Sequence, residues 1–197
     1  MFKRVKTLFI SNTLASLGVA CILNSGLGCF SITAANMAVS GWLNMPLSMA
    51  AILIETVMII YATIKGEGLG LTALVNATYG SIMIDVFHRI LICHPLLVIG
   101  GLIIPVAWAY MGKVGFGDTG SNILMTALSK TTGKSLRFIR TLEEGFFFTL
   151  GLLGASQYVS LFTLFLTFIL GPILQVVYNF VDYDPLTIEH KYIIKGR

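Results

Sequence analysis

Charged side chains are scarce in this chain. Asp, Glu, Lys and Arg make up 11% of its 197 residues, against about 25% in an average soluble domain. Hydrophobic residues make up 56%, and the mean hydropathy is +0.86. A water-soluble fold of this length has too little interior to hide so much apolar surface. The composition therefore excludes a soluble globular domain and predicts an integral membrane protein.

Cysteine and histidine are also scarce, with three residues each. An odd number of cysteines provides no disulfide framework, and Cys21, Cys29 and Cys93 lack the spacing of metal ligands. His88 and His94 lie near Cys93, but no fourth ligand accompanies them, so we expect no metal site. No Ser/His/Asp or Cys/His set stands out for catalysis. We therefore expect neither an enzyme nor a cofactor.

A phosphate-binding loop is missing as well, although the letters GKS occur at residues 133–135. A P-loop follows the pattern G-x-x-x-x-G-K-[ST] between a strand and a helix. The first position of that pattern here is Leu128, where glycine is required. The sequence therefore does not predict nucleotide binding at this stretch.

What the chain does contain is long apolar runs. Six windows have about the 20-residue length that an α-helix needs to cross a hydrocarbon layer roughly 30 Å thick. They cover residues 8–28, 46–64, 69–87, 96–111, 136–155 and 159–180. The predicted fold class is all-α, a polytopic membrane protein with six transmembrane helices. Basic residues before the first span resemble a secretory signal, but five spans follow it, and we interpret it as an uncleaved anchor.

The Lys and Arg residues provide a test of this topology, because they accumulate in cytoplasmic loops. With the amino terminus inside, only Arg89 of the 13 basic residues falls on the outer side. A missed or invented span would switch the side of every later loop. The sequence therefore predicts both termini in the cytoplasm, with a tail at residues 183–197. The net charge of +4 then reflects topology, and we expect no nucleic-acid partner.

The two halves of the chain resemble each other. A shift of 89 residues lays residues 26–55 onto residues 115–144 with seven identities in thirty positions. The identical pairs are Gly26 and Gly115, Gly28 and Gly117, Ala38 and Ala127, Ser40 and Ser129, Leu47 and Leu136, Leu53 and Leu142, and Glu55 and Glu144. Each unit has three spans, so the second enters the membrane from the opposite side.

We therefore predict one membrane domain over residues 1–197, with inverted repeats at about residues 7–90 and 95–182. Inverted repeats are common in secondary transporters, where their symmetry relates two states that face opposite sides of the membrane. An old duplication kept only for packing is the alternative explanation.

In both units a short helical segment follows a G-x-G turn, at residues 31–42 and 120–131. Ser and Thr at these helix starts, together with Asp118, are able to cap the first N–H groups. A helix start carries partial positive charge, so a segment that dips into the membrane would offer an anion or a carboxylate a binding point. The alternative is an interfacial helix lying flat, with Trp42 at the headgroups.

Two glutamates, Glu55 and Glu144, lie near the middle of the second and fifth spans and coincide in the repeat. An ionised side chain at the bilayer centre costs roughly 2.5–3.5 kcal/mol, so such residues usually face a bundle interior or a water-filled cavity. This carboxylate pair suits proton or cation coupling. Arg140, four residues before Glu144, could instead satisfy that carboxylate structurally. Asp85 lies within i+4 reach of Arg89 and is predicted to be structural.

Asn76 and Tyr79 in the third span either line a polar path or bond to a neighbouring helix. The candidate substrate-binding or coupling residues are Glu55, Glu144, Gly28, Thr33, Asn36, Asn76, Tyr79, Gly117, Asp118, Thr119 and Asn122. We predict a small secondary transporter or permease that holds an unknown small solute between the repeats. The alternative is a non-transporting membrane partner that stabilises or regulates another protein complex. Both alternatives have the lipid bilayer as a partner, and the sequence does not decide whether the protein forms a homo-oligomer.

Four stretches carry a family resemblance. They are GLG at residues 26–28, GLTALVNATYGSIMIDVF at 70–87, GFGDTGSNILMTALSKTTGKSLRFIRTLEEGFFFTLGLLGA at 115–155 and LGP at 170–172. Over nearly the whole chain they resemble the YczE/YyaS/YitT-type bacterial integral membrane proteins. The chain departs from that family at residues 29–33, CFSIT, where members often carry an acidic residue. The resemblance implies a multi-pass protein of the bacterial cytoplasmic membrane and brings no established substrate.

Overall fold

A computed structural model describes residues 2–182 and 193–194 of the chain. Their regular secondary structure is helical, apart from one antiparallel pair of two-residue strands, β1 (Leu69–Gly70) and β2 (Ile193–Ile194). The longer helices are α1 (Phe2–Asn24), α3 (Leu47–Ile64), α8 (Leu136–Gly154) and α9 (Leu161–Val181). The shorter helices are α2 (Ser31–Leu43), α4 (Leu71–Val75), α5 (Ser81–Ile90), α6 (Ile103–Lys113) and α7 (Gly120–Thr132). A π turn (Asn76–Gly80) joins α4 to α5, and 3₁₀ segments at Pro95–Leu102 and Ser156–Tyr158 precede α6 and α9.

These helices lie where the apolar windows predicted them. α1, α3, α8 and α9 coincide with four predicted spans, α4 and α5 with a fifth, and α6 with its 3₁₀ segment with the sixth. α2 and α7 coincide with the two short segments that follow the G-x-G turns. The helical fold class is thereby confirmed. The predicted tail, residues 183–197, lies outside the described residues except for β2.

Three helical segments are long and apolar enough to cross a membrane by length and composition: Phe2–Asn24, Leu47–Ile64 and Pro95–Lys113. Large apolar side chains are exposed along α1, α3, α5, α6, α8 and α9. An exposed apolar surface of this kind marks a face that meets lipid or another protein. The long apolar helices support the membrane association that the composition predicted, whereas the number of crossings stays a prediction.

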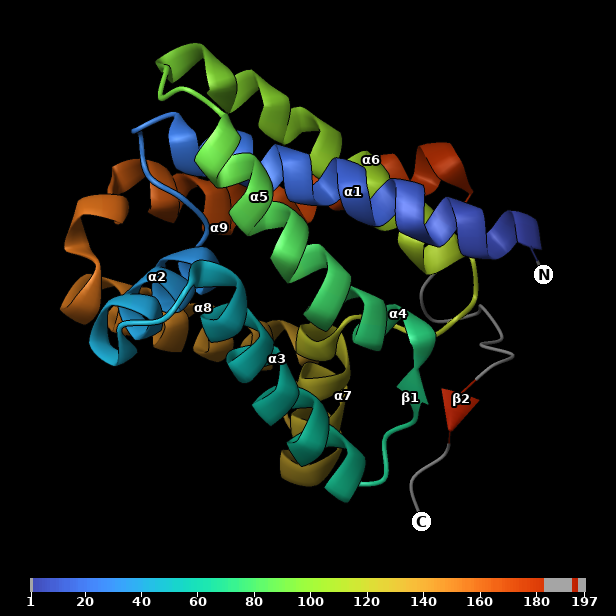
Figure 1. Ribbon diagram of the computed structural model, residues 1–197. Coiled ribbons are helices and arrows are strands. Elements are labelled where there is room, and N and C mark those ends of the chain that lie inside the picture. The colour runs from blue at the N-terminus through green and yellow to red at the C-terminus, as the bar shows by residue number, and fades with distance from the viewer. Residues whose placement is uncertain (1, 183–192, 195–197) are drawn as a thin grey trace.

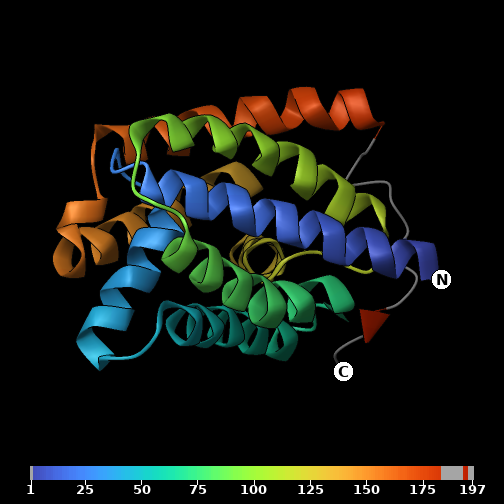
Figure 2. The same cartoon turned by 45° about the horizontal axis from the view of Figure 1, so that its top comes forward.

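The helices form a bundle (Figure 1). α1 packs against α5 and α6, and these three run side by side in both Figure 1 and Figure 2. α2 packs against α8 and α3, while α3 also packs against α7 and α5. α9 packs against α6. Figure 2 looks along the axis of α7, which lies near the middle of the bundle.

Small residues set the spacing between the packed helices. A Cβ atom at Gly18 of α1 would collide with the side chain of Ile104 on α6, and one at Gly151 of α8 would collide with Ala34 on α2. Helices in membranes associate through such small residues because they let two backbones approach closely. The two crossings, α1 with α6 and α2 with α8, therefore depend on glycine.

The second G-x-G turn makes a tighter approach, between two backbones. A Cβ atom at Gly70 of β1 would lie 2.7 Å from the Cα of Gly117 and against the carbonyl oxygen of Phe116. The same carbonyl accepts a hydrogen bond from the N–H of Thr72 at 3.3 Å. This contact holds the start of α4 next to the turn that leads into α7.

We expect Gly70→Ala to lower the free energy of unfolding by about 1–3 kcal/mol, because overpacking against a backbone leaves no side chain that can move aside. The matched control is Gly41→Ala in α2, where a Cβ atom meets nothing within 4 Å and alanine favours the helix by roughly 0.5–1 kcal/mol. Thermal unfolding of the purified protein in detergent measures both. Equal melting temperatures for Gly70→Ala and wild type would contradict the contact.

Candidate functional site

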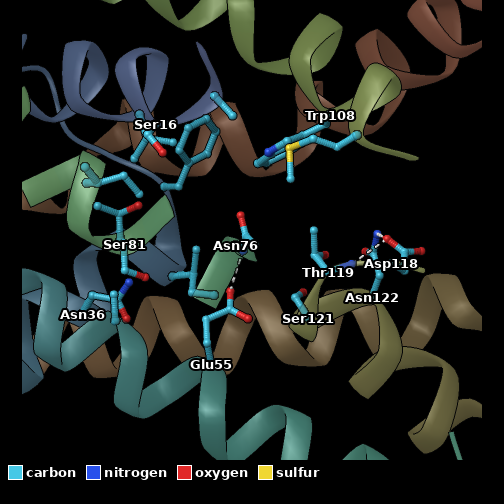
Figure 3. Close-up of a pocket in the computed structure, with 18 of the residues that line it drawn as sticks. Ser16, Asn36, Glu55, Asn76, Ser81, Trp108, Asp118, Thr119, Ser121 and Asn122 are labelled. Carbon is cyan, nitrogen blue, oxygen red and sulfur yellow. Dashed lines mark hydrogen bonds between the residues drawn. The ribbon is translucent and has the colours of Figure 1, made fainter. Parts of the chain in front are cut away.

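A cavity of about 170 Å³ lies among helices α1 to α8 and the π turn. An apolar cavity of about 150 Å³ is large enough to hold benzene, so this one has room for a small solute or several waters. Figure 3 shows Trp108 and Ser16 on one side and Glu55, Asn36 and Ser121 on the other. The charged residues that line it are Glu55, Asp118, Glu143, Glu144 and Arg140.

Glu55 of α3 points into the cavity (Figure 3) and is only 8% exposed. Its Oε1 accepts a hydrogen bond from Asn76 Nδ2 at 3.3 Å, and Asn76 Oδ1 accepts one from Asn12 Nδ2 at 3.4 Å. Its Oε2 has no hydrogen-bond partner among the described residues. A Cβ atom at Gly120, the first residue of α7, would collide with this oxygen. Glycine at that position therefore makes room for Glu55 at the start of α7.

Glu144 of α8 occupies the corresponding place at the start of α2. Its Oε2 accepts a hydrogen bond from the hydroxyl of Ser31, the first residue of α2. Its Oε1 lies 3.0 Å from Arg140 Nη2 and accepts a hydrogen bond from Arg140 Nε at 3.1 Å. The i,i+4 ion pair that the sequence allowed is present, so Glu144 is fully partnered.

Glu143, the neighbour of Glu144, was not predicted from the sequence. It is 8% exposed, its Oε1 accepts a hydrogen bond from Ser121 Oγ at 2.7 Å, and its Oε2 has no partner among the described residues. It lines the same cavity as Glu55. Helical periodicity was the available signal, because Ile139 and Phe147, four residues on either side, are buried at 4% and 5% exposure.

Eight of the eleven predicted site residues line this cavity: Glu55, Glu144, Thr33, Asn36, Asn76, Asp118, Thr119 and Asn122. The other three lie elsewhere. Gly28 and Gly117 adopt φ angles of +124° and +91° in the two turns. Tyr79 forms a hydrogen bond of 2.8 Å with Thr13 Oγ1 and packs edge-on against Phe9. These three contribute to turns and helix packing.

The predicted helix caps are not formed. α2 begins after Phe30 without a side-chain cap, and Thr119 before α7 likewise makes no side-chain cap. Asp118 Oδ1 accepts hydrogen bonds from the N–H of Thr119 at 2.8 Å and from Asn122 Nδ2 at 2.6 Å. The serine hydroxyls that could have capped, at positions 31 and 121, donate to glutamates of α8.

Both short helices begin in the interior. In α2, exposure rises from 1% at Ser31 to 54% at Trp42 near its other end. In α7, Gly120 is buried and Thr132 is exposed. The place that an anionic solute was expected to take, at each helix start, is therefore held by the chain's own carboxylates, Glu144 and Glu55.

Asp85 lies outside the cavity and is structural, as its spacing from Arg89 predicted. Arg89 Nε donates to Asp85 Oδ1 at 3.0 Å, and Ser48 Oγ donates to Asp85 Oδ2 at 3.0 Å. The carboxylate thus ties α5 to α3.

The comparison with protein families covers almost the whole chain. A family model described as "Family of unknown function (DUF6198)" matches residues 2–179. The chain belongs to this family. No curated protein and no solved structure matches it. The DUF6198 match includes every residue that lines the cavity, whereas the resemblance to YczE/YyaS/YitT-type proteins stays a prediction.

Replacing the two adjacent glutamates by glutamine is expected to give opposite results. Glu144→Gln leaves Arg140 without its ionic partner and lowers the melting temperature, because breaking a partly buried pair strands a charge. Glu143→Gln keeps an acceptor for Ser121 and removes a carboxylate that no cation contacts, so its melting temperature equals or exceeds that of wild type. Thermal unfolding in detergent at neutral pH compares the two. A larger loss for Glu143→Gln than for Glu144→Gln would contradict the assignment.

Proposed function

We propose that this DUF6198 protein is a small secondary transporter of the bacterial cytoplasmic membrane, working by alternating access between two inverted repeats. One observation carries the proposal. The start of α2 meets the glutamate of α8, through Ser31 and Glu144, and the start of α7 meets the glutamate of α3, through Gly120 and Glu55. The 89-residue shift that aligns the two halves converts one pair into the other.

Most of the packing between helices exchanges in the same way, although the contact of α3 with α5 has no comparable counterpart between α8 and α9 among the described residues. The shift pairs α1 with α6, α2 with α7, α3 with α8, and α5 with α9. Under this exchange the contact of α2 with α8 corresponds to the contact of α7 with α3. The contact of α2 with α3 corresponds to that of α7 with α8, and the contact of α1 with α5 corresponds to that of α6 with α9. The contact of α1 with α6 becomes itself. This pattern supports a two-fold relation between the halves.

Such symmetry provides two related states. Each half inserts its short helix against the second long helix of the other half, and the cavity lies between them. If the halves exchange conformations, a cavity closed on one side becomes closed on the other. Six spans with both termini in the cytoplasm complete the proposal, as the distribution of Lys and Arg predicts.

The cavity also bears on the alternative of a non-transporting membrane partner. A scaffold would be expected to have a dry, packed centre around Glu55. Polar side chains of α1, α2, α3, α7 and α8 instead surround open volume beside that carboxylate. This observation favours transport over a purely structural role.

Cys93 allows the topology to be tested in the natural sequence. It is exposed, whereas Cys21 and Cys29 are buried, and the proposed topology places it on the outer side. We expect a membrane-impermeant maleimide added to intact cells to modify wild type and to leave Cys93→Ser unmodified. Modification that requires cell lysis would contradict the proposed orientation.

Transport itself can be tested with proteoliposomes and a panel of small solutes. We expect wild type to accumulate at least one solute and Glu55→Gln to slow its uptake about tenfold or more, because a hydrogen bond to a charged group contributes roughly 1.5–3 kcal/mol. The matched control is Glu67→Gln, since Glu67 pairs with Lys130 at 2.8 Å outside the cavity. Identical behaviour of Glu55→Gln and wild type for every solute would overturn the role of Glu55.

A further inference from the structure

Hydrogen-bond acceptors without partners gather in the cavity. Within residues 2–182, the buried side-chain N and O atoms that lack a partner are Asn12 Oδ1, Asn36 Oδ1, Glu55 Oε2, Thr72 Oγ1 and Glu143 Oε2. All are oxygens, and four of the five belong to residues that line the cavity. Carboxylate and amide oxygens only accept hydrogen bonds. A ligand that satisfies the three unpartnered carboxylate and amide oxygens of the lining must therefore donate hydrogen bonds, whereas the hydroxyl of Thr72 is able to donate as well as accept.

The charges of the lining residues lead to the same conclusion. Four carboxylates face one guanidinium, and Arg140 is already paired with Glu144 at 3.0 Å. Glu55 and Glu143, each 8% exposed, have no cationic partner among the described side chains. A buried carboxylate without a counter-charge is costly, and the cost falls when a cation approaches. An anionic ligand would meet repulsion from both.

Much of the remaining lining of the cavity is apolar. Trp108 lies across from Glu55 (Figure 3), and the other apolar residues of the lining are Ala15, Val19, Phe30, Ile32, Ala51, Ile84, Met111 and Phe147. An indole face attracts organic cations, whereas a hydrated inorganic ion gains little from such a wall. Among the described residues no group of three His, Cys, Asp or Glu side chains is placed to hold a metal ion. A volume of about 170 Å³ limits the ligand to a size near that of benzene.

We propose that the cavity binds a small organic ammonium ion. Its N–H groups donate to Glu55 Oε2 and Glu143 Oε2, and its hydrocarbon part lies against the wall formed around Trp108. The claim that this ion is the transported solute rests on the proposed function above. Its binding is a separate property that can be measured without transport.

The chain contains its own reporter for this binding. It has two tryptophans, and Trp42 is 54% exposed at the end of α2 while Trp108 lines the cavity. Trp42→Phe leaves Trp108 as the single fluorophore. The full-length protein in nanodiscs is titrated with cyclohexylammonium, with its neutral counterpart cyclohexanol, and with sodium chloride. We expect a saturable change in Trp108 fluorescence with cyclohexylammonium, binding at least about tenfold weaker for cyclohexanol, and no saturable change with sodium.

Two variants in the Trp42→Phe background test the carboxylates. Glu55→Gln and Glu143→Gln are each expected to weaken cyclohexylammonium binding about tenfold or more while leaving cyclohexanol unchanged, because only the ammonium ion uses the charge. Glu67→Gln, outside the cavity, keeps the affinity of the parent. Gel filtration and thermal unfolding establish that each variant is folded. If neither glutamine variant folds, the affinities of the Trp42→Phe protein for cyclohexylammonium and cyclohexanol alone test the proposal.

The proposal is overturned by equal affinities for the ammonium ion and the alcohol, by unchanged ammonium affinity in both folded glutamine variants, or by saturable binding of sodium in place of the ammonium ion. The absence of any response to cyclohexylammonium also overturns it. Ammonium binding without uptake in proteoliposomes would refute the transporter and leave this site standing. Uptake of another solute without ammonium binding would refute only the solute class.

Discussion

The need to compensate buried carboxylates organises the interior of this protein. An apolar helical bundle holds Glu55, Glu143 and Glu144 in its centre, and each must find partners there because water solvates it poorly. Glu144 obtains an arginine and a serine hydroxyl, whereas Glu55 obtains a single amide and Glu143 a single hydroxyl. The two related helix starts are therefore unequal, although all three glutamates line the same cavity.

Glycine makes this arrangement sterically feasible. Gly120 leaves space for Glu55 at the start of α7, and Gly70 lets the chain pass directly beside the turn that leads there. On the other half, Gly151 lets α8 approach α2 closely enough for Ser31 to reach Glu144. The glycines that give the backbone space thus lie next to the helix starts where the glutamates are held. A glycine far from any charge can in this way control where a carboxylate lies.

The helices were predictable because local signals specify them. Apolar length marked the spans, and the G-x-G turns marked the starts of α2 and α7. The missed residue was Glu143, since the repeat drew attention to Glu144 alone and aligned Glu143 with Ile54. The caps failed for another reason: Ser31 and Ser121 found carboxylate acceptors on α8, and no local pattern reports a partner more than twenty positions away. The cavity likewise arises from packing between distant segments.

The π turn at Asn76–Gly80 provides a point at which the helical segment formed by α4 and α5 can shift its register. A π turn contains one residue more than an α turn and is frequent at functional sites. Ser16 Oγ donates to the carbonyl of Gly80 at its end, at 3.0 Å, so α1 supports the irregular backbone. Moving the extra residue along the helix would rotate Asn76 by about 100° relative to α5. Such a register shift would withdraw the amide from Glu55 while the rest of the helix stayed in place.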